Sequence, residues 1–132
     1  MLGELIGEVH GKQVGARVVD EHGKVEVSTQ ESGKLLGMEA QNWTTFSVVA
    51  RPDGTLWGEG QGAGTTRDGE PFTFRGQGVG VMTGRGMGAT YRGAIYYQSP
   101  SPKLARLHKV AGVFEYDVDE NGNTHAKIWE WK

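Results

Sequence analysis

Residues 56–97 read LWGEGQGAGTTRDGEPFTFRGQGVGVMTGRGMGATYRGAIYY. Within this stretch, glycine occupies every second position in three runs, from Gly58 to Gly64, from Gly76 to Gly80 and from Gly84 to Gly88. Because side chains alternate between the two faces of a β-strand, each run removes the side chains from one whole face. A bare face predicts that a tightly curved sheet, a neighbouring backbone or a ligand lies against it.

The remainder of the chain also alternates between apolar and polar residues. We expect further strands at 3–20, 24–30, 36–50, 110–119 and 124–131, beside glycine strands at 55–66 and 70–82 and one ending at 94–98. The one long irregular connection is 99–109, with 104–107 as a candidate helical turn. No segment keeps helical spacing over the ~10–12 residues that a helix needs. We therefore predict a single all-β domain, 1–132, with eight antiparallel strands in an up-and-down meander closed into a small barrel.

Four turn sequences share one form, in which two ordinary residues precede a glycine. They are Glu21-His22-Gly23, Pro52-Asp53-Gly54, Arg67-Asp68-Gly69 and Glu120-Asn121-Gly122. This form is typical of the three-residue hairpin loop, in which the glycine adopts a left-handed conformation. Under that reading Phe72 lies opposite Gly64, Phe74 opposite Gly62 and Phe46 opposite Gly60. The segment Ser32-Gly33-Lys34 predicts a break or bulge in the second strand.

This pairing favours an inner face that carries both the glycines and the large apolar residues. The residues then expected to line the lumen and bind a ligand are Phe46, Gly60, Phe72, Phe74, Gly78, Phe114 and Tyr116. Two-residue turns would reverse the parity and turn a polar set inward. In that case Glu59 or Glu115 would be the candidate catalytic acid or base, with Gln61, Arg75 and Gln77 as polar anchors.

Composition excludes several classes of function. The net charge is −2, which gives no electrostatic footprint for nucleic acid or an anionic membrane. The absence of cysteine excludes disulfides and thiol chemistry. The four histidines fall in separate segments, and we expect neither a metal nor another cofactor. With no apolar run near the ~20 residues of a membrane helix, and with Glu4 and Glu8 in place of a basic leader, we expect a cytoplasmic protein.

The tryptophans carry a signal about association. Trp43, Trp57, Trp129 and Trp131 all occupy odd positions, which the inner-face prediction turns outward. Exposed tryptophan is costly, so a homo-oligomer with tryptophan at the interface is one expectation. The alternative is that the parity changes locally and that some of these rings fill the barrel ends.

Several strings are similar to a family of small bacterial proteins of unassigned function. They are GKQVGARVV (11–19), RPDGTLWGEGQG (51–62), DGEPFTFRGQGVG (68–80), SPKLARL (101–107), VFEYDVDENGN (113–123) and WEWK (129–132). More distantly, VMTGRGMGATYRGAIYYQ (81–98) resembles the glycine-rich hairpin of allene oxide cyclase and dirigent-type barrels. The second resemblance implies a calycin-like barrel, and no catalytic residue carries over with it.

Three functions follow from these observations. The first is the binding of a small, mostly apolar ligand in the lumen. The second is an isomerase or cyclase that encloses an apolar substrate and uses a glutamate as acid or base. The third is a structural protein with a filled barrel that assembles through its tryptophans. The type of turn separates the first two, and an empty lumen separates both from the third.

Overall fold

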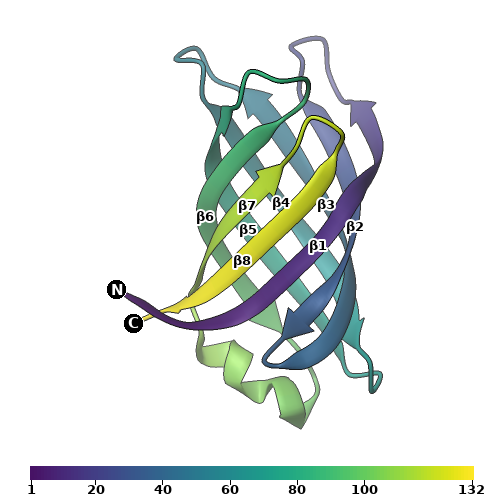
Figure 1. Cartoon of the computed structure of the whole chain (residues 1–132), viewed down its shortest axis with the longest axis vertical. Helices are drawn as coiled ribbons and strands as arrows, with labels where there is room; N and C mark the ends of the chain where they lie inside the picture. Colours follow the sequence, from purple (N-terminus) through teal and green to yellow (C-terminus); the bar gives the residue numbers. More distant parts are fainter.

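The computed structural model describes residues 1–132 and is a closed barrel of eight antiparallel strands in sequence order (Figure 1). The strands are β1 (Leu2–Val18), β2 (Val25–Leu35), β3 (Met38–Ala50), β4 (Leu56–Thr66), β5 (Pro71–Met82), β6 (Ala89–Gln98), β7 (Gly112–Val118) and β8 (Asn123–Trp131). A short 3₁₀ helix, η1 (Pro102–Lys109), joins β6 to β7. Pairing of β1 with β8 closes the sheet and leaves no edge strand. The predicted fold class is confirmed.

The predicted register at the glycine strands is also confirmed. Gly60 lies opposite Phe46, Gly62 opposite Phe74 and Gly64 opposite Phe72. Three hairpins have the three-residue loops expected from their sequences, 52–54, 67–69 and 120–122, and the glycine that ends each loop has a positive φ. The β1–β2 connection differs, because Val19 donates its backbone N–H to the carbonyl of Lys24 and leaves a four-residue loop, 20–23.

Two other connections correct the sequence predictions. The chain does not break at 32–34. It runs straight through to Leu35 and then turns at Leu36 and Gly37, which both have positive φ, +51° and +79°. The third glycine run belongs to no strand, since residues 83–88 form the β5–β6 loop, with positive φ at Gly84 and Gly86. The register shifts lie in β1, between Gln13 and Gly15 against β2, and between Leu2 and Leu5 and between Leu5 and Gly7 against β8.

The apolar core divides between the two ends of the barrel. The larger cluster lies at the end that η1 covers, where Leu104 and Leu107 are fully buried against Ile6, Phe72 and Ile128. Figure 1 shows η1 at the lower end of the barrel, on one side. The smaller cluster lies towards the other end and consists of Leu56, Ala89, Tyr91 and Val118. Between these two clusters the lumen is not filled.

The sequence of η1 explains its position. Ser101 is the N-cap and accepts a hydrogen bond from the backbone N–H of Lys103, and Pro102 supplies the preset φ that suits a first helical position. Leu104 and Leu107 are three residues apart, so in a 3₁₀ helix they lie on one face, which points into the barrel. No helix of the structure is long and apolar enough to cross a bilayer.

The tryptophans lie outside the lumen, as the parity predicted. Trp43 and Trp131 are 58% and 63% exposed, and Trp57 and Trp129 are half-buried. None of the four lines the central cavity. Neither apolar cluster at the barrel ends contains a tryptophan, so the alternative that these rings fill the barrel ends is wrong.

Candidate ligand cavity

A cavity of about 120 Å³ occupies the middle of the lumen. All strands from β1 to β8 contribute to its wall, and most of the wall is apolar. Its large lining side chains are Phe46, Phe72, Phe74, Tyr91, Tyr97, Phe114 and Tyr116, with Val9, Ile95 and Ile128 between them. A cavity of ~150 Å³ with such walls holds benzene in other proteins. The free space therefore corresponds to one small ring.

The aromatic side chains form two groups. Towards the η1 end, Phe72, Phe74 and Tyr97 contact one another with ring centroids 5.5–6.4 Å apart. Towards the other end, Tyr116 packs at 5.8 Å from Phe46 and 6.0 Å from Tyr91. These distances are typical of favourable edge and offset contacts between rings. The rings within each group support one another, and the cavity lies between the two groups.

One wall of the cavity carries a buried carboxyl group, that of Glu31, which is only 5% exposed. Its Oε1 accepts hydrogen bonds from Asn42 Nδ2 at 3.1 Å and Thr44 Oγ1 at 3.3 Å. Its Oε2 accepts one from Thr124 Oγ1 at 2.9 Å. No lysine, arginine or histidine forms an ion pair with this carboxyl. Only neutral donors contact this carboxyl, so it has no cationic partner within the protein.

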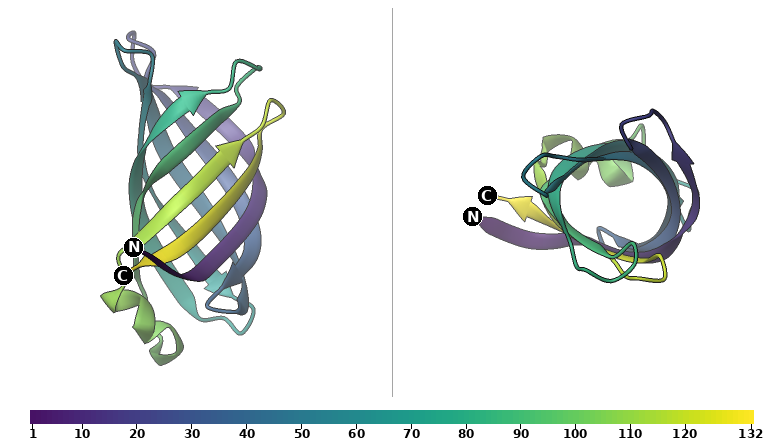
Figure 2. Two further views of the ribbon diagram at one scale, coloured as in Figure 1. Left: turned by 60° about the vertical axis from the view of Figure 1, so that its left-hand side comes forward. Right: turned by 90° about the horizontal axis from the view of Figure 1, so that it is seen from above.

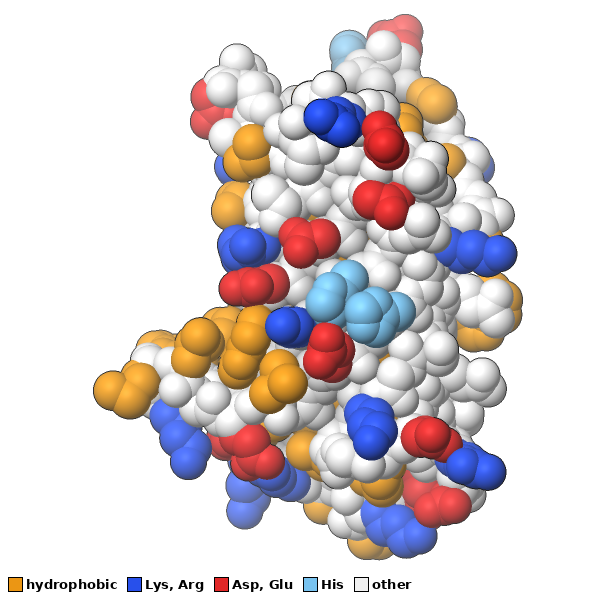
Figure 3. Space-filling model, in the orientation of Figure 1, with side chains coloured by type: hydrophobic (Ala, Val, Ile, Leu, Met, Phe, Trp, Pro, Cys, Tyr) orange, Lys and Arg blue, Asp and Glu red, His pale blue; other side chains and the backbone are white.

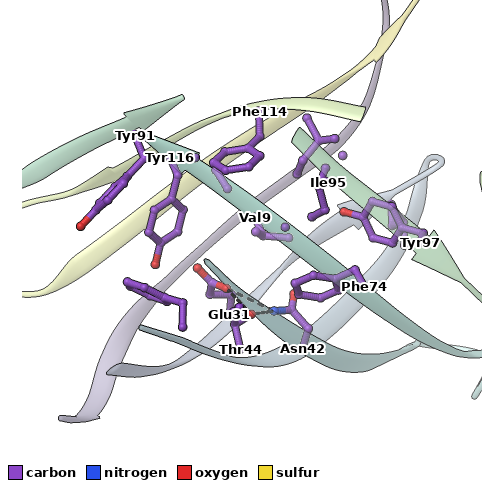
Figure 4. A pocket seen from close by; sticks show the side chains of 18 of the residues that line it. Val9, Glu31, Asn42, Thr44, Phe74, Tyr91, Ile95, Tyr97, Phe114 and Tyr116 are labelled. Atoms are coloured by element: carbon purple, nitrogen blue, oxygen red, sulfur yellow. Dashed lines mark hydrogen bonds between the residues drawn. The ribbon is translucent and has the colours of Figure 1, made fainter. Parts of the chain in front are cut away.

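Three tyrosine hydroxyls of the cavity wall respond to their buried environment. Burial, and then the charge of Glu31, raise the pKa of Tyr97 and of Tyr116 far above that of a free phenol. Burial alone raises the pKa of Tyr91. All three therefore stay neutral donors at physiological pH. Neither the buried hydroxyl of Tyr116 nor that of Thr29 has a hydrogen-bond partner. The hydroxyls of Thr29 and Thr124 both lie near the hydroxyl of Tyr116. In Figure 4 the Tyr116 hydroxyl points towards Glu31.

The space left by the missing side chains of the glycines is occupied mainly by aromatic rings and by the backbone of the adjoining strands. A Cβ at Gly62 would collide with the ring of Phe74, and one at Gly80 would lie 2.5 Å from the ring of Tyr91. At Gly60 and Gly78 the obstacle is the adjoining strand's backbone. Close approach of strands and rings stacked over bare glycine both allow tight coiling of the sheet. The cavity is the space that remains beyond those rings.

All seven residues predicted to bind a ligand line this cavity, namely Phe46, Gly60, Phe72, Phe74, Gly78, Phe114 and Tyr116. Their role in binding stays a prediction. The polar residues expected inside under two-residue turns do not project into the cavity. Glu59 and Gln77 border the cavity between glycines but are exposed, and Gln61 and Arg75 are exposed beside a shallow hollow on the outer wall.

Glu115 does not line the cavity, and its carboxylate lies 3.8 Å from the Arg92 guanidinium in an exposed ion pair. Glu59 and Glu115 were candidates only for a reversed inner face, and the leading parity placed both outside. Glu31, whose buried carboxyl does lie in the cavity wall, was not among the candidates. The signal was present, because Val25, Val27 and Thr29 alternate and the same parity reaches Glu31. Asn42 likewise continues the even-numbered inner face of β3. The predicted break at 32–34 obscured the continuity of β2 beyond Gln30.

Comparisons with known proteins support the fold and no more. No protein-family model and no curated protein sequence matches the chain. A crystal structure of a protein of unknown function from Clostridium acetobutylicum is similar with a TM-score of 0.80 at 14% identity, over 98% of both chains. A conserved protein of unknown function from Rhodopseudomonas palustris has a TM-score of 0.78 at 12% identity, over 98% of this chain and 97% of that one. These two similarities lend no support to the cyclase and dirigent resemblance.

Proposed function

We propose that the chain binds a small, mostly apolar molecule in its lumen. The observation that carries the proposal is a cavity of about 120 Å³ with aromatic walls and a single buried carboxyl that has no cationic partner. Burial of apolar ligand surface contributes roughly 25 cal/mol per Å². One aromatic ring is the size of ligand that this space accepts.

The polar wall defines the ligand more closely. A cationic or hydroxyl-bearing head group could bind without breaking an existing ion pair. It would contact the carboxyl of Glu31 and the hydroxyl of Tyr116. An anionic head would be repelled by the same carboxyl. We therefore expect the preferred ligand to combine one apolar ring with an amine or a hydroxyl group, in the manner of benzylamine or benzyl alcohol.

Four one-ring compounds of nearly equal size test this proposal: toluene, benzyl alcohol, benzylamine and benzoate. Ligand-observed NMR and titration calorimetry with the full chain should show saturable binding of the first three and none of benzoate. Glu31→Gln should weaken benzylamine about tenfold or more, because a charge-assisted hydrogen bond contributes ~1.5–3 kcal/mol. The same variant should leave toluene binding almost unchanged.

A filled lumen provides the matched control. Val9→Phe adds a ring to the cavity wall and should abolish binding of all the compounds, whereas Gln41→Leu, at an exposed position of β3 that does not line the cavity, should not. Circular dichroism would verify that each variant is folded. Failure of all four compounds to bind the wild type would reject the proposal and favour the third reading, a barrel that serves only as a structural unit.

The second candidate is an isomerase or cyclase, in line with the distant resemblance to allene oxide cyclase. Glu31 would replace Glu59 and Glu115 as its acid or base, since only Glu31 is buried in the cavity wall. Deuterium exchange at the α-carbon of a small ring ketone such as cyclohexanone, lost in Glu31→Gln, would favour this candidate over simple binding. The cytoplasmic location stays a prediction.

A further inference from the structure

The outer wall carries a second group of polar side chains, remote from the lumen, where the first and last strands meet. Glu8 and His10 are two residues apart on β1, so both point outward, and His10 lies directly opposite His125 on β8. In Figure 3 two adjacent histidine side chains occupy the middle of this face. These three residues are the seam cluster.

The seam cluster is compact. The two imidazole rings stack with centroids 4.0 Å apart and an interplanar angle of 11°. Nε2 of His125 lies 2.7 Å from Oε2 of Glu8, and Nε2 of His10 lies 3.8 Å from the same oxygen. One ligand atom from each of the three residues lies within 4.8 Å of the others.

From this geometry we infer that the seam cluster binds one divalent transition-metal ion of the Zn²⁺ class through two imidazoles and a carboxylate. Atoms bound to one Zn²⁺ at ~2.0–2.2 Å lie roughly 3–4 Å apart, so small side-chain rotations bring all three into range. Nitrogen ligands of this kind favour Zn²⁺, Cu²⁺ and Ni²⁺ over Mg²⁺ and Ca²⁺.

The surroundings allow access. The side chain of His10 is 66% exposed, and those of His125 and Glu8 are 36% and 37% exposed. Three protein ligands with solvent on the fourth side are the number found in open zinc sites. Charges of both signs lie nearby. Glu8 is paired across the sheet with Lys127 on β8 and with Lys34 on β2. His125 is paired with Asp117 on β7. Asp117 is engaged with Thr90 at 2.6 Å.

Because the three ligands come from β1 and β8, the metal would join the two strands that close the barrel. A metal that binds only the folded protein raises its apparent stability. Zinc should therefore raise the midpoint of thermal unfolding as well as bind. This second readout is independent of any activity in the lumen.

Titration calorimetry of the full chain with Zn²⁺, in a buffer that does not chelate metals, tests the inference. We expect one ion per chain and no binding of Mg²⁺. His125→Gln and His10→Gln should each weaken zinc at least ~10-fold, since loss of a mere supporting partner already costs ~10–100-fold. Both variants should also lose the zinc-dependent rise in melting temperature.

His22→Gln is the matched control, because His22 is also exposed and lies 3.8 Å from a carboxylate, that of Glu21, without a third ligand. It should bind zinc as the wild type does. Co²⁺ substitution should give visible absorption bands that disappear in His125→Gln. The inference is wrong if the wild type binds no zinc at 100-fold excess over protein, or if zinc affinity is equal in the wild type and in both seam variants.

Discussion

At the scale of the residue, the glycines of β4 and β5 determine how closely the strands approach. Gly78 is paired directly with Gly93, and an added Cβ at Gly78 would lie 2.5 Å from the Arg92 carbonyl oxygen. Gly15 in β1 is different, because nothing lies within 4 Å of its hypothetical Cβ. Replacement by alanine should therefore change the stability of the protein in opposite directions at Gly78 and at Gly15.

Gly78→Ala should destabilise the protein by about 1–3 kcal/mol, since the new methyl group forces the backbones of β5 and β6 apart. Gly15→Ala should leave the free energy of unfolding unchanged or raise it by about 0.5 kcal/mol, because alanine loses less conformational entropy on folding than glycine does. Urea unfolding monitored by tryptophan fluorescence measures both. Equal effects of the two substitutions would show that backbone approach does not explain the glycine strips.

At the scale of the element, the sequence predicted strands more accurately than connections. Alternation between the faces of β3, β4 and β5 was readable because their loops have the two-residues-plus-glycine form. The turn at Leu36 and Gly37 was missed because it needs positive φ at a leucine, which the sequence gives no reason to expect. That one turn hid the last residues of β2, and with them the buried carboxyl of Glu31.

The candidate site was predictable to the same extent. The apolar wall followed from parity, which required only the register of neighbouring strands. The hydrogen bonds of Glu31 join β2, β3 and β8, and the seam cluster joins β1 and β8. Contacts between the two ends of the chain depend on barrel closure and on shear. No local pattern determines either of these, so four histidines in separate segments gave no sign that two of them stack.

At this scale we predict how much η1 contributes to the free energy of unfolding. Leu107 is 0% exposed and packs inside the η1 end of the barrel. Leu107→Ala should cost about 2–5 kcal/mol, the usual loss on truncating a buried leucine. Lys109→Ala, on the exposed side of the same helix, should change the free energy of unfolding by less than ~0.5 kcal/mol. If both variants unfold at the wild-type urea concentration, η1 is not part of the cooperative core.

At the scale of the whole molecule, the two chain ends leave the barrel side by side (Figure 2). Leu2 is paired with Trp131 and Leu5 with Trp129, and these side chains form an exposed apolar surface on the projecting ribbon, which also carries Glu4 and Glu130. Met1 is 87% exposed, Leu2 56% and Trp131 63%. A contiguous apolar surface of this kind is unusual on a monomer. A second copy of the chain is the partner that would cover it by symmetry.

We therefore predict a homodimer that buries this terminal ribbon. In a two-fold interface each substitution acts twice, and loss of a central tryptophan commonly costs about 2 kcal/mol or more. Trp131→Gln should shift the wild-type dimer to monomer at micromolar concentration in sedimentation velocity. Trp43→Gln removes a similarly exposed ring from β3, which does not belong to the terminal ribbon, and should leave the dimer intact. A wild type that sediments only as a 14.3 kDa species would refute the prediction, and dissociation by Trp43→Gln instead would place the interface on the outer wall of β3.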